Sequence, residues 1–325
     1  MTEYTKPRRG GALSRLRPGR GGVVAALAVL TALVLLAHPW IPSGPAARHL
    51  GSLVQTFLPW TGLAVPVLAA AALLRRSRRA LAAVLLPALV WGGLYGSALG
   101  DGARGGPALA DLTVVTHNVD DANPDPAGTA RAVAASGAQL IALEELTRPA
   151  LDAYERELAA SHPYHVVQGT VGLWSTFPLR GAGGTPIVPW RLLLRATAET
   201  PKGPVTVYVA HLPSVRLGAG GFATERRDEA ARNLAAQLRA GPAGRTVLVG
   251  DFNGTTADGA LAPVTGGFTA AQEAVGAGFG FSWPARFPVA RIDQILLRGG
   301  LTPLAAWTLP PTRSDHLPVA ASLRY

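Results

Sequence analysis

Residues 246–253 have the sequence Thr-Val-Leu-Val-Gly-Asp-Phe-Asn, in which a short hydrophobic run ends directly in Asp251 and Asn253. A run of this length, bounded by turn residues, is typical of a buried strand. Functional side chains are often carried on the loops that follow such strands, where a rigid sheet positions them. The stretch therefore predicts a strand over residues 246–249 that delivers an acid and an amide to a site.

The same arrangement recurs along the second part of the chain. Expected strands cover residues 112–116, 139–143, 171–176, 191–197, 205–211, 292–297 and 319–323. Polar residues lie at or just beyond the ends of four of them, namely Asn118, Glu145, His211 and Asp293. Asp315 and His316 come just before the last strand. Residues at one set of strand ends converge when the strands share a sheet, so these side chains are expected to gather at one edge.

Helical segments separate several of these strands, which predicts an α/β domain. We expect helices over residues 126–136, 149–160 and 225–240. In the last of these, Ala230, Leu234 and Leu238 recur every four residues, as on the buried face of an amphipathic helix. Thr224 is expected to cap its N-terminus, and Gly241-Pro242 ends it. Arg226 and Arg227 are expected on its solvated face.

Six motifs occur in a fixed order in this region. They are Asn118-Val119-Asp120, Leu143-Glu144-Glu145, Ala210-His211-Leu212, Gly250-Asp251-Phe252-Asn253, Arg291-Ile292-Asp293-Gln294-Ile295 and Ser314-Asp315-His316-Leu317-Pro318-Val319. Together they resemble the endonuclease/exonuclease/phosphatase superfamily, the DNase I-like metal-dependent phosphoesterases, over residues 111–325. The resemblance implies a four-layered α/β sandwich of two mixed sheets with helices outside.

The resemblance also implies a divalent metal ion, Mg²⁺ or Mn²⁺, held by oxygen ligands. Carboxylate and amide oxygens are the ligands that Mg²⁺ prefers. Glu145 would be the principal ligand, Asn118 a ligand-side amide, and Asp120 and Asp315 would complete the shell directly or through water. Glu144 stands where relatives often carry Gln, and we expect it to be solvated or to support the ligands.

The same resemblance assigns the catalytic side chains. Asp251 would orient or deprotonate the attacking water, and Asn253 would hold a phosphate oxygen. His316 would contact the phosphate or take the proton, while Asp293 would fix the tautomer of its imidazole. His211 would donate to a phosphate oxygen as charge develops on it. Taken singly, each residue has a structural alternative: Asn118 could end a strand, Asp293 could be a cap, and His211 could be a buried core histidine.

The formal net charge of +10 does not indicate a nucleic-acid partner. Eleven of the 30 Lys and Arg residues and one of the 20 acidic residues lie in the first 100, which leaves 19 of each sign in residues 101–325. The second part of the chain is neutral, so a DNA-binding face would have to arise from local clustering. The chain also has no cysteine, which excludes disulfides and a thiolate nucleophile.

The basic excess accompanies three apolar, uncharged runs over residues 23–41, 50–74 and 80–99. A membrane-spanning helix needs roughly 20 apolar residues, so we expect three spans within residues 23–99. Pro59 and Pro66 predict a kink in the second run. A signal peptide followed by buried helices would explain the first run only.

The charges between the runs predict an orientation. Six Lys and Arg residues precede the first run within the tail 1–22, and Arg75, Arg76, Arg78 and Arg79 separate the second run from the third. The positive-inside rule places both segments in the cytoplasm and residues 111–325 outside, after a linker over residues 100–110.

Three spans before such a domain resemble a membrane-anchored actinobacterial branch of the superfamily, the VanJ-type teicoplanin-resistance proteins. That resemblance implies antibiotic resistance and hydrolysis of a polyprenyl pyrophosphate, or a related lipid-linked cell-wall intermediate, at the outer face of the membrane. An extracellular membrane-bound nuclease or sphingomyelinase-like phosphodiesterase is the alternative. A membrane protein with a non-catalytic relic domain is a second alternative. The sequence does not indicate an oligomeric state.

Overall fold

A computed structural model of the chain describes residues 21–44, 47, 49–100, 110–218 and 221–325. The basic tail up to residue 20, Arg48, and most of the expected linker, residues 101–109, lie outside this description. The described chain forms two compact units. One holds residues up to Leu35 together with Thr61–Trp91, and the other holds Leu36–Trp60 together with Gly92–Tyr325.

The first unit consists of apolar helices that expose much of their hydrophobic surface. It is formed from most of α1 (Gly22–Ala37), α3 (Ala64–Leu74) and most of α4 (Arg78–Tyr95). Ala28, Leu68 and Val84 are buried where the helices pack together. Leu30 is 56 % exposed and Leu89 is 74 % exposed, which is the surface expected of a helix that faces lipid.

Two of the described helices are long and apolar enough to cross a membrane, Gly22–Trp40 and Arg78–Leu99, with mean hydropathies of 2.2 and 1.6. The expected second span is a bent pair instead, Leu50–Thr56 followed by Leu58–Leu74 with an angle of 66° between them. The kink expected from Pro59 and Pro66 is therefore confirmed as a break at residue 57.

Residues 36–60 belong to the same compact unit as the α/β domain, together with residues 92–100 at the end of the third apolar run. Their elements are η1 (His38–Trp40), α2 (Leu50–Thr56), the first residues of η3 (Leu58–Leu63), the last residues of α4, and η4 (Gly96–Leu99).

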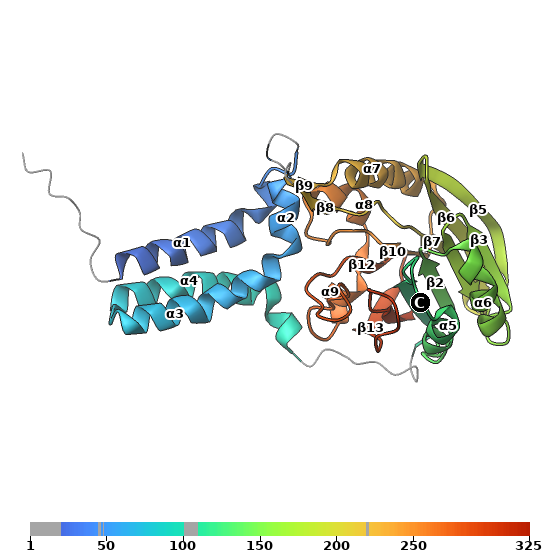
Figure 1. Ribbon diagram of the computed structural model, residues 1–325, viewed down its shortest axis with the longest axis horizontal. Coiled ribbons are helices and arrows are strands. Elements are labelled where there is room, and N and C mark those ends of the chain that lie inside the picture. The colour runs from blue at the N-terminus through green and yellow to red at the C-terminus, as the bar shows by residue number, and fades with distance from the viewer. Residues whose placement is uncertain (1–20, 45–46, 48, 101–109, 219–220) are drawn as a thin grey trace, which may run out of the picture. The chain divides into compact units, whose positions relative to one another are not determined.

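The α/β domain is built on two six-stranded sheets (Figure 1). The first has the order β13 (Thr302–Thr308), β14 (Val319–Arg324), β1 (Leu112–Asn118), β2 (Leu140–Glu144), β4 (Val171–Ser175), β3 (Tyr164–Gln168). The second has the order β11 (Thr269–Ala270), β12 (Asp293–Arg298), β10 (Thr246–Asp251), β7 (Gly203–Val209), β6 (Arg191–Thr200), β5 (Leu179–Val188). A short hairpin pairs β8 (Arg216–Gly218) with β9 (Gly221–Ala223).

Alternating side chains divide each strand between two hydrophobic cores. In β10, Val247 and Val249 belong to the core shared by both sheets, whereas Leu248 lies in a separate core with α7 (Glu225–Ala240). In β1, Val114 faces the shared core and Val115 packs with α5 (Pro126–Ala134) and α6 (Arg148–Leu158). This period of two is what a strand covered on both faces requires.

The layers therefore run from α5 and α6, through the first sheet and the second sheet, to α7 (Figure 1). Short elements complete the second half of the domain: η6 (Gly259–Leu261), α8 (Ala262–Thr265) and α9 (Ala271–Val275). The expected sandwich of two mixed sheets with helices outside is confirmed.

Candidate active site

Strand direction explains why the predicted residues meet. In the first sheet, β1 and β2 are parallel, so their carboxyl ends lie together and Asn118 is opposite Glu144. In the second sheet, β10 and β12 are antiparallel, so the end of one strand meets the start of the other and Asp251 is opposite Asp293. Each expected strand end thus delivers its polar residue to the same edge of its sheet.

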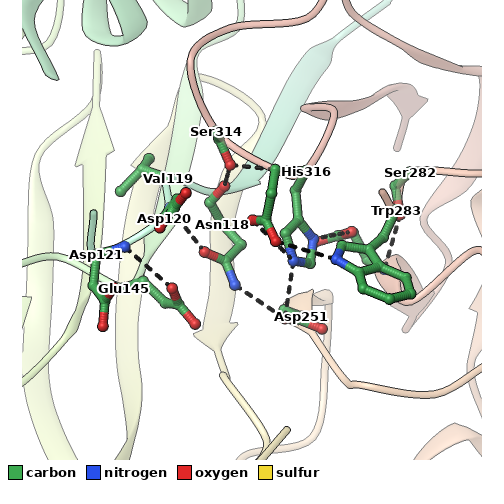
Figure 2. A network of polar contacts seen from close by, with 12 residues as sticks. Asn118, Val119, Asp120, Asp121, Glu145, Asp251, Ser282, Trp283, Ser314 and His316 are labelled. Atoms are coloured by element: carbon green, nitrogen blue, oxygen red, sulfur yellow. Dashed lines mark hydrogen bonds and ion pairs between the residues drawn. The ribbon is translucent and has the colours of Figure 1, made fainter. Parts of the chain in front are cut away.

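Asp251 is held by three N–H donors in the space between the two sheets, and Figure 2 shows the one from Asn118. The Asn118 Nδ2 donates to its Oδ2 at 3.0 Å, the Asn253 Nδ2 donates to the same oxygen at 3.1 Å, and the Asn253 backbone N donates to Oδ1 at 2.8 Å. Burial raises the pKa of Asp251 to about 7, against the opposing charge of His316. Asp251 can therefore exchange a proton near neutral pH.

Gly250 allows this strand end to approach its neighbour. Its φ is 135°, and a Cβ at this position would lie 1.9 Å from the Ala210 carbonyl oxygen. Only glycine fits such an approach. The residue before Asp251 must therefore be glycine, because β10 packs closely against the segment that carries His211.

Asn253 orients Asp251 in this structure. Its side-chain amide donates to the Leu212 carbonyl at 3.0 Å as well as to Asp251, so both amide N–H groups are engaged. Contact with a phosphate oxygen, which the resemblance assigns to Asn253, would require one of these hydrogen bonds to open.

His316 and Asp293 form a buried ion pair, with 2.9 Å between Nδ1 and Oδ2. Burial lowers the pKa of His316, but the charge and hydrogen bond of Asp293, with the charges of Asp251 and Asp315, outweigh it, and the pKa rises to about 10. The imidazole is therefore a cation at neutral pH. Its Nε2 lies 3.8 Å from Asp251 Oδ2.

His211 is fully buried, and neither of its ring nitrogens has a hydrogen-bond partner among the described residues. Its Nε2 lies 3.5 Å from Glu145 Oε1 and 3.7 Å from Asp251 Oδ2. Burial lowers the pKa of His211 well below its usual value, and the charges of Arg191 and His316 add to this effect. A neutral imidazole keeps one N–H, which is available to an incoming ligand.

Asp120, Asp121 and Glu145 form a group of carboxylates at the rim, with one oxygen from each within 4.8 Å of the others. The Asp121 backbone N donates to Glu145 Oε2, and the Asp120 backbone N donates to the side chain of Asn118 (Figure 2). Asp120 and Glu145 have positive φ angles of 64° and 61°, a conformation that is uncommon away from glycine and is often found at functional sites.

Asp315 lies apart from this group. Its carboxylate accepts a hydrogen bond from the Trp283 indole at 3.2 Å and lies 3.8 Å from His316 Nε2, and its side chain is 56 % exposed. In the described residues it belongs to neither group of clustered metal-binding side chains.

Glu144 is completely buried, which corrects the expectation that it is solvated. The Thr116 hydroxyl donates to one of its oxygens at 2.8 Å, and the other has no partner among the residues that the structure describes. Burial raises the pKa of Glu144 well above its usual value, although the hydrogen bond from Thr116 opposes the shift. Burial therefore favours the neutral form of Glu144.

Arg227, which was expected on the solvated face of α7, is instead buried and supports the site through the Asn253 carbonyl. It is 1 % exposed rather than solvated. Its guanidinium donates to Asp258 Oδ2 at 2.7 Å, to the Asn253 carbonyl at 3.1 Å and to the hydroxyl of Ser52, in α2, at 3.3 Å. Its position three residues before Ala230, on the apolar face of α7, is the signal in the sequence that indicates burial.

The family of the chain follows from comparison with known proteins. The model of the Endonuclease/Exonuclease/phosphatase family matches residues 115–316, which is more than half of the chain. The chain belongs to this family. The match runs from within β1 to His316 and so includes every predicted site residue. A search of curated proteins finds no match.

Solved structures of this family share the fold at low sequence identity. D. rerio TDP2 complexed with single-strand DNA product is 18 % identical, with a TM-score of 0.57 over 66 % of this chain and 99 % of that one. A mannosyl-6-phosphatase from Bacteroides thetaiotaomicron is 16 % identical, with a TM-score of 0.55 over 66 % and 100 %. Sphingomyelinase C from Streptomyces griseocarneus is 20 % identical, with a TM-score of 0.51 over 65 % and 98 %. At these identities the comparisons show similarity of fold alone.

The residues present fit the divalent ion that this family implies. Asp120, Asp121 and Glu145 offer only carboxylate oxygens, the donor type that Mg²⁺ and Mn²⁺ accept. A second group, Asp251, Asp293 and His316, also brings three potential ligand atoms within 4.8 Å of one another. Two of the four predicted ligands, Asp120 and Glu145, thus lie in one cluster. A third, Asn118, accepts a hydrogen bond from the Asp120 backbone N.

Proposed function

We propose that the chain is a membrane-anchored, divalent-metal-dependent phosphoesterase. The observation that carries this proposal is the juxtaposition of the buried Asp251 carboxylate with the His316–Asp293 ion pair, whose imidazole Nε2 lies 3.8 Å from Asp251 Oδ2. A base and a fixed cation within one buried site can activate water and bind the phosphate that the water attacks.

Each side chain of the site has its own role in the proposed reaction. Asp251 accepts the proton of the attacking water, and Asn118 and Asn253 keep its carboxylate in place. The His316 imidazolium, held by Asp293, contacts a phosphate oxygen and supplies a positive charge. His211 donates its single N–H to a second phosphate oxygen, which gives its buried ring the partner it otherwise lacks.

We assign the metal site to Glu145 and Asp120, with Asn118 and Asp315 contributing directly or through water, and add Asp121 from the geometry. A bound Mg²⁺ or Mn²⁺ would neutralise charge on the phosphate group and help to orient it. The backbone of residues 120–122 holds the carboxylates together, since the Asp121 N donates to Glu145 and the Ala122 N donates to Asp120.

The substrate we propose is a polyprenyl pyrophosphate, or a related lipid-linked cell-wall intermediate, at the outer face of the membrane. Two candidate spans and the bent apolar pair support a membrane location. The distribution of Lys and Arg supports the outward orientation of the site. The neutral charge of residues 101–325 supports a substrate other than nucleic acid.

The test is hydrolysis by the full-length chain in detergent, with and without Mg²⁺ or Mn²⁺, measured as phosphate released from the pyrophosphate, phosphocholine released from sphingomyelin and strand cleavage of DNA. A polyprenyl pyrophosphate, DNA and sphingomyelin are compared in parallel, because a preference for either of the last two would support the alternative phosphodiesterases. Asp251→Ala and His316→Ala should each lower activity by about 100- to 10,000-fold, as loss of a general acid or base does.

His165→Ala is the matched control, because His165 is an exposed histidine of β3, the edge strand of the first sheet, and its ring contacts Glu155 rather than a site residue. It should retain full activity. Activity that survives Asp251→Ala, or that is equal with and without a divalent ion, would contradict the proposal.

A further inference from the structure

A cavity of about 510 Å³ lies outside the site, and all of its lining residues belong to the second compact unit. Its walls come from η1 and α2, from residues 94–98 at the end of the last apolar helix, from the loop after β10, and from α9 with the loop that follows. Apolar and aromatic side chains line much of it, including Pro59, Leu94, Tyr95, Val275, Phe279 and Phe281.

Stacked aromatic rings form one side of this cavity. Phe279 and Phe281 are parallel, with centroids 5.2 Å apart, and Trp60 stacks on Phe281 at 5.5 Å. Tyr95 meets Phe279 edge-on at 6.0 Å. The Trp60 indole donates to the Val289 carbonyl at 2.8 Å, which fixes the orientation of its ring. The wall is therefore a preformed apolar surface rather than a set of mobile side chains.

Three polar side chains at the cavity pair with one another, whereas His38 Nδ1, Gln272 Oε1 and Arg291 Nε have no hydrogen-bond partner among the described residues. Arg291 pairs with Glu273 and also donates to the Thr256 hydroxyl, and Thr256 donates to the same carboxylate. No unpaired charge in this trio opposes an apolar occupant, because the guanidinium and the carboxylate neutralise each other.

Three segments of the cavity wall continue directly into the active site. Thr255 follows Asn253 by two residues, Arg291 precedes Asp293 by two, and Phe281 precedes Trp283 by two. Two residues of extended chain span at most about 7 Å, so each segment connects the two places over a short distance.

Trp283 marks the point where the wall reaches the site. Its indole donates to Asp315 at 3.2 Å, and the ring lies beside His316 (Figure 2). It is 37 % exposed, and Phe287, which tilts against Trp60 with centroids 6.5 Å apart, is 69 % exposed. Large exposed rings of this kind continue the apolar surface from the cavity to the rim of the site.

Residues of the candidate membrane segments also line the cavity. Leu94 and Tyr95 lie in the candidate span Arg78–Leu99, and Pro59 lies in the second segment of the bent pair. Residues of the candidate membrane segments and Phe281, two residues before Trp283, thus line one cavity.

We propose that this cavity binds the hydrocarbon chain of a substrate whose terminal phosphate or diphosphate lies at Asp251 and His316. The inference rests on the proposed function, because it takes the reacting phosphate to be at that site. The cavity selects substrates by the chain attached to the phosphate: it admits a single linear chain entering from the lipid, and it gives a soluble phosphoester no comparable contact.

The test uses butyl, hexyl and octyl phosphate as substrates of the full-length chain in lipid nanodiscs. We expect kcat/KM to rise about fourfold for each methylene that enters the cavity, equivalent to ~0.8 kcal/mol per buried methylene. Ala274→Trp should abolish this rise. Ala274 lines the cavity but is itself exposed, so the larger ring can enter without displacing the core.

Ala240→Trp is the matched control. Ala240 is exposed at the end of α7 and lines a separate cavity of about 160 Å³, so the same substitution there should preserve the dependence on chain length. The proposal is overturned if Ala274→Trp keeps the wild-type dependence, or if both variants lose it equally.

A binding measurement separates this inference from the proposed function. Octyl phosphate brominated at its chain end should quench tryptophan fluorescence saturably without any added metal, and Trp60→Phe should remove that quenching. If the brominated ligand quenches Trp60 but no alkyl phosphate is hydrolysed with Mg²⁺ or Mn²⁺, the proposed function fails and the cavity is still a chain-binding site. If hydrolysis occurs with no dependence on chain length and no quenching of Trp60, the cavity proposal alone fails.

Discussion

Substitution of Arg227 by Met removes a buried cation and leaves the carboxylate of Asp258, which is also fully buried, without its charged partner. Breaking a buried ion pair in this way costs about 3–5 kcal/mol, because one charge stays in a medium of low dielectric constant. The remaining donors to Asp258 are the Ser52 hydroxyl and the Ala260 backbone N, and neither carries a charge. We therefore expect a loss of about 3–5 kcal/mol in the free energy of unfolding.

The assay is thermal unfolding of the full-length chain in detergent. For a domain of this size each kcal/mol lowers the midpoint by about 2–4 °C, so the expected decrease is about 6–20 °C. Arg226→Met is the matched control on the neighbouring residue. Arg226 is exposed and lies 5.5 Å from the centroid of the Trp190 ring, an interaction worth about 0.5–1 kcal/mol at an exposed site.

A double variant distinguishes an unpaired charge from lost packing. Arg227→Met combined with Asp258→Asn removes both charges of this pair, and the amide oxygen of Asn can still accept from the Ala260 N. Asp228, which also accepts from the Arg227 guanidinium, at 2.6 Å, keeps its charge in both variants. We expect the double variant to be more stable than Arg227→Met alone. If the single variant costs no more than Arg226→Met, or if the double variant is less stable than the single one, the guanidinium of Arg227 does not stabilise the fold in the way described.

Three further outcomes are expected. Asp293→Asn removes the charge that raises the pKa of His316 to about 10, so the imidazole loses its proton at lower pH and the alkaline limb of the kcat/KM profile should move toward neutral pH; an unmoved limb would contradict the ion-pair role. Glu144→Gln should raise the unfolding temperature at mildly alkaline pH, and the unfolding temperatures of the variant and the wild type should become equal below pH 4.5. Above that pH, Glu144 ionises in the unfolded wild-type chain, whereas burial favours its neutral form in the folded chain. A constant difference at all pH values would argue against a neutral Glu144. Ala160→Cys introduces a single exposed thiol into a chain without cysteine, and a reagent that cannot cross membranes should label it in intact cells if the site faces outward; labelling only after lysis would place the domain in the cytoplasm.

The hydrophobic periodicity of the sequence predicted the elements that have a clear buried face of their own. The helix expected over residues 225–240 is α7, with the same bounds, and the strand expected from residue 246 is β10. The side chain of Thr224 does not cap α7, however. It interacts with Asp228 and His49 instead, at 2.7 Å each, because α2 brings His49 to that end of the helix.

Strands without a periodic pattern were not predicted. β5 contains Gly181, Gly183, Gly184 and Pro186, residues that are depleted in strands, and much of it is exposed. Its conformation is fixed by pairing with β6, along which its register shifts twice. β3 and β13 are likewise completed by pairing with β4 and β14, strands whose positions depend on the whole sheet.

The active site was more predictable than its surroundings. Asn118, Asp251 and Asp293 were recognisable because each ends or begins a hydrophobic strand, a local signal that already implies a shared edge. Asp121 was missed because a second carboxylate after Asp120 has no distinguishing pattern in the sequence. The hydrogen bonds of Ser52 with Asp258 and Arg227 join residues about two hundred positions apart, and no local pattern reports such a contact.

The buried contacts of α2 with the α/β domain determine the outcome of proteolytic cleavage of the chain. Residues 50–56 are joined to the α/β domain through Ser52, through Gln55, which accepts from the Gly259 N at 3.0 Å, and through neighbouring His49, which contacts Thr224 and Glu225. A protease that cleaved between residues 100 and 110 would sever the covalent connection after the last apolar helix. The domain would nevertheless not be shed, because the first hundred residues would still hold it by these contacts, of which those of Ser52 with Asp258 and of His49 with Thr224 are buried.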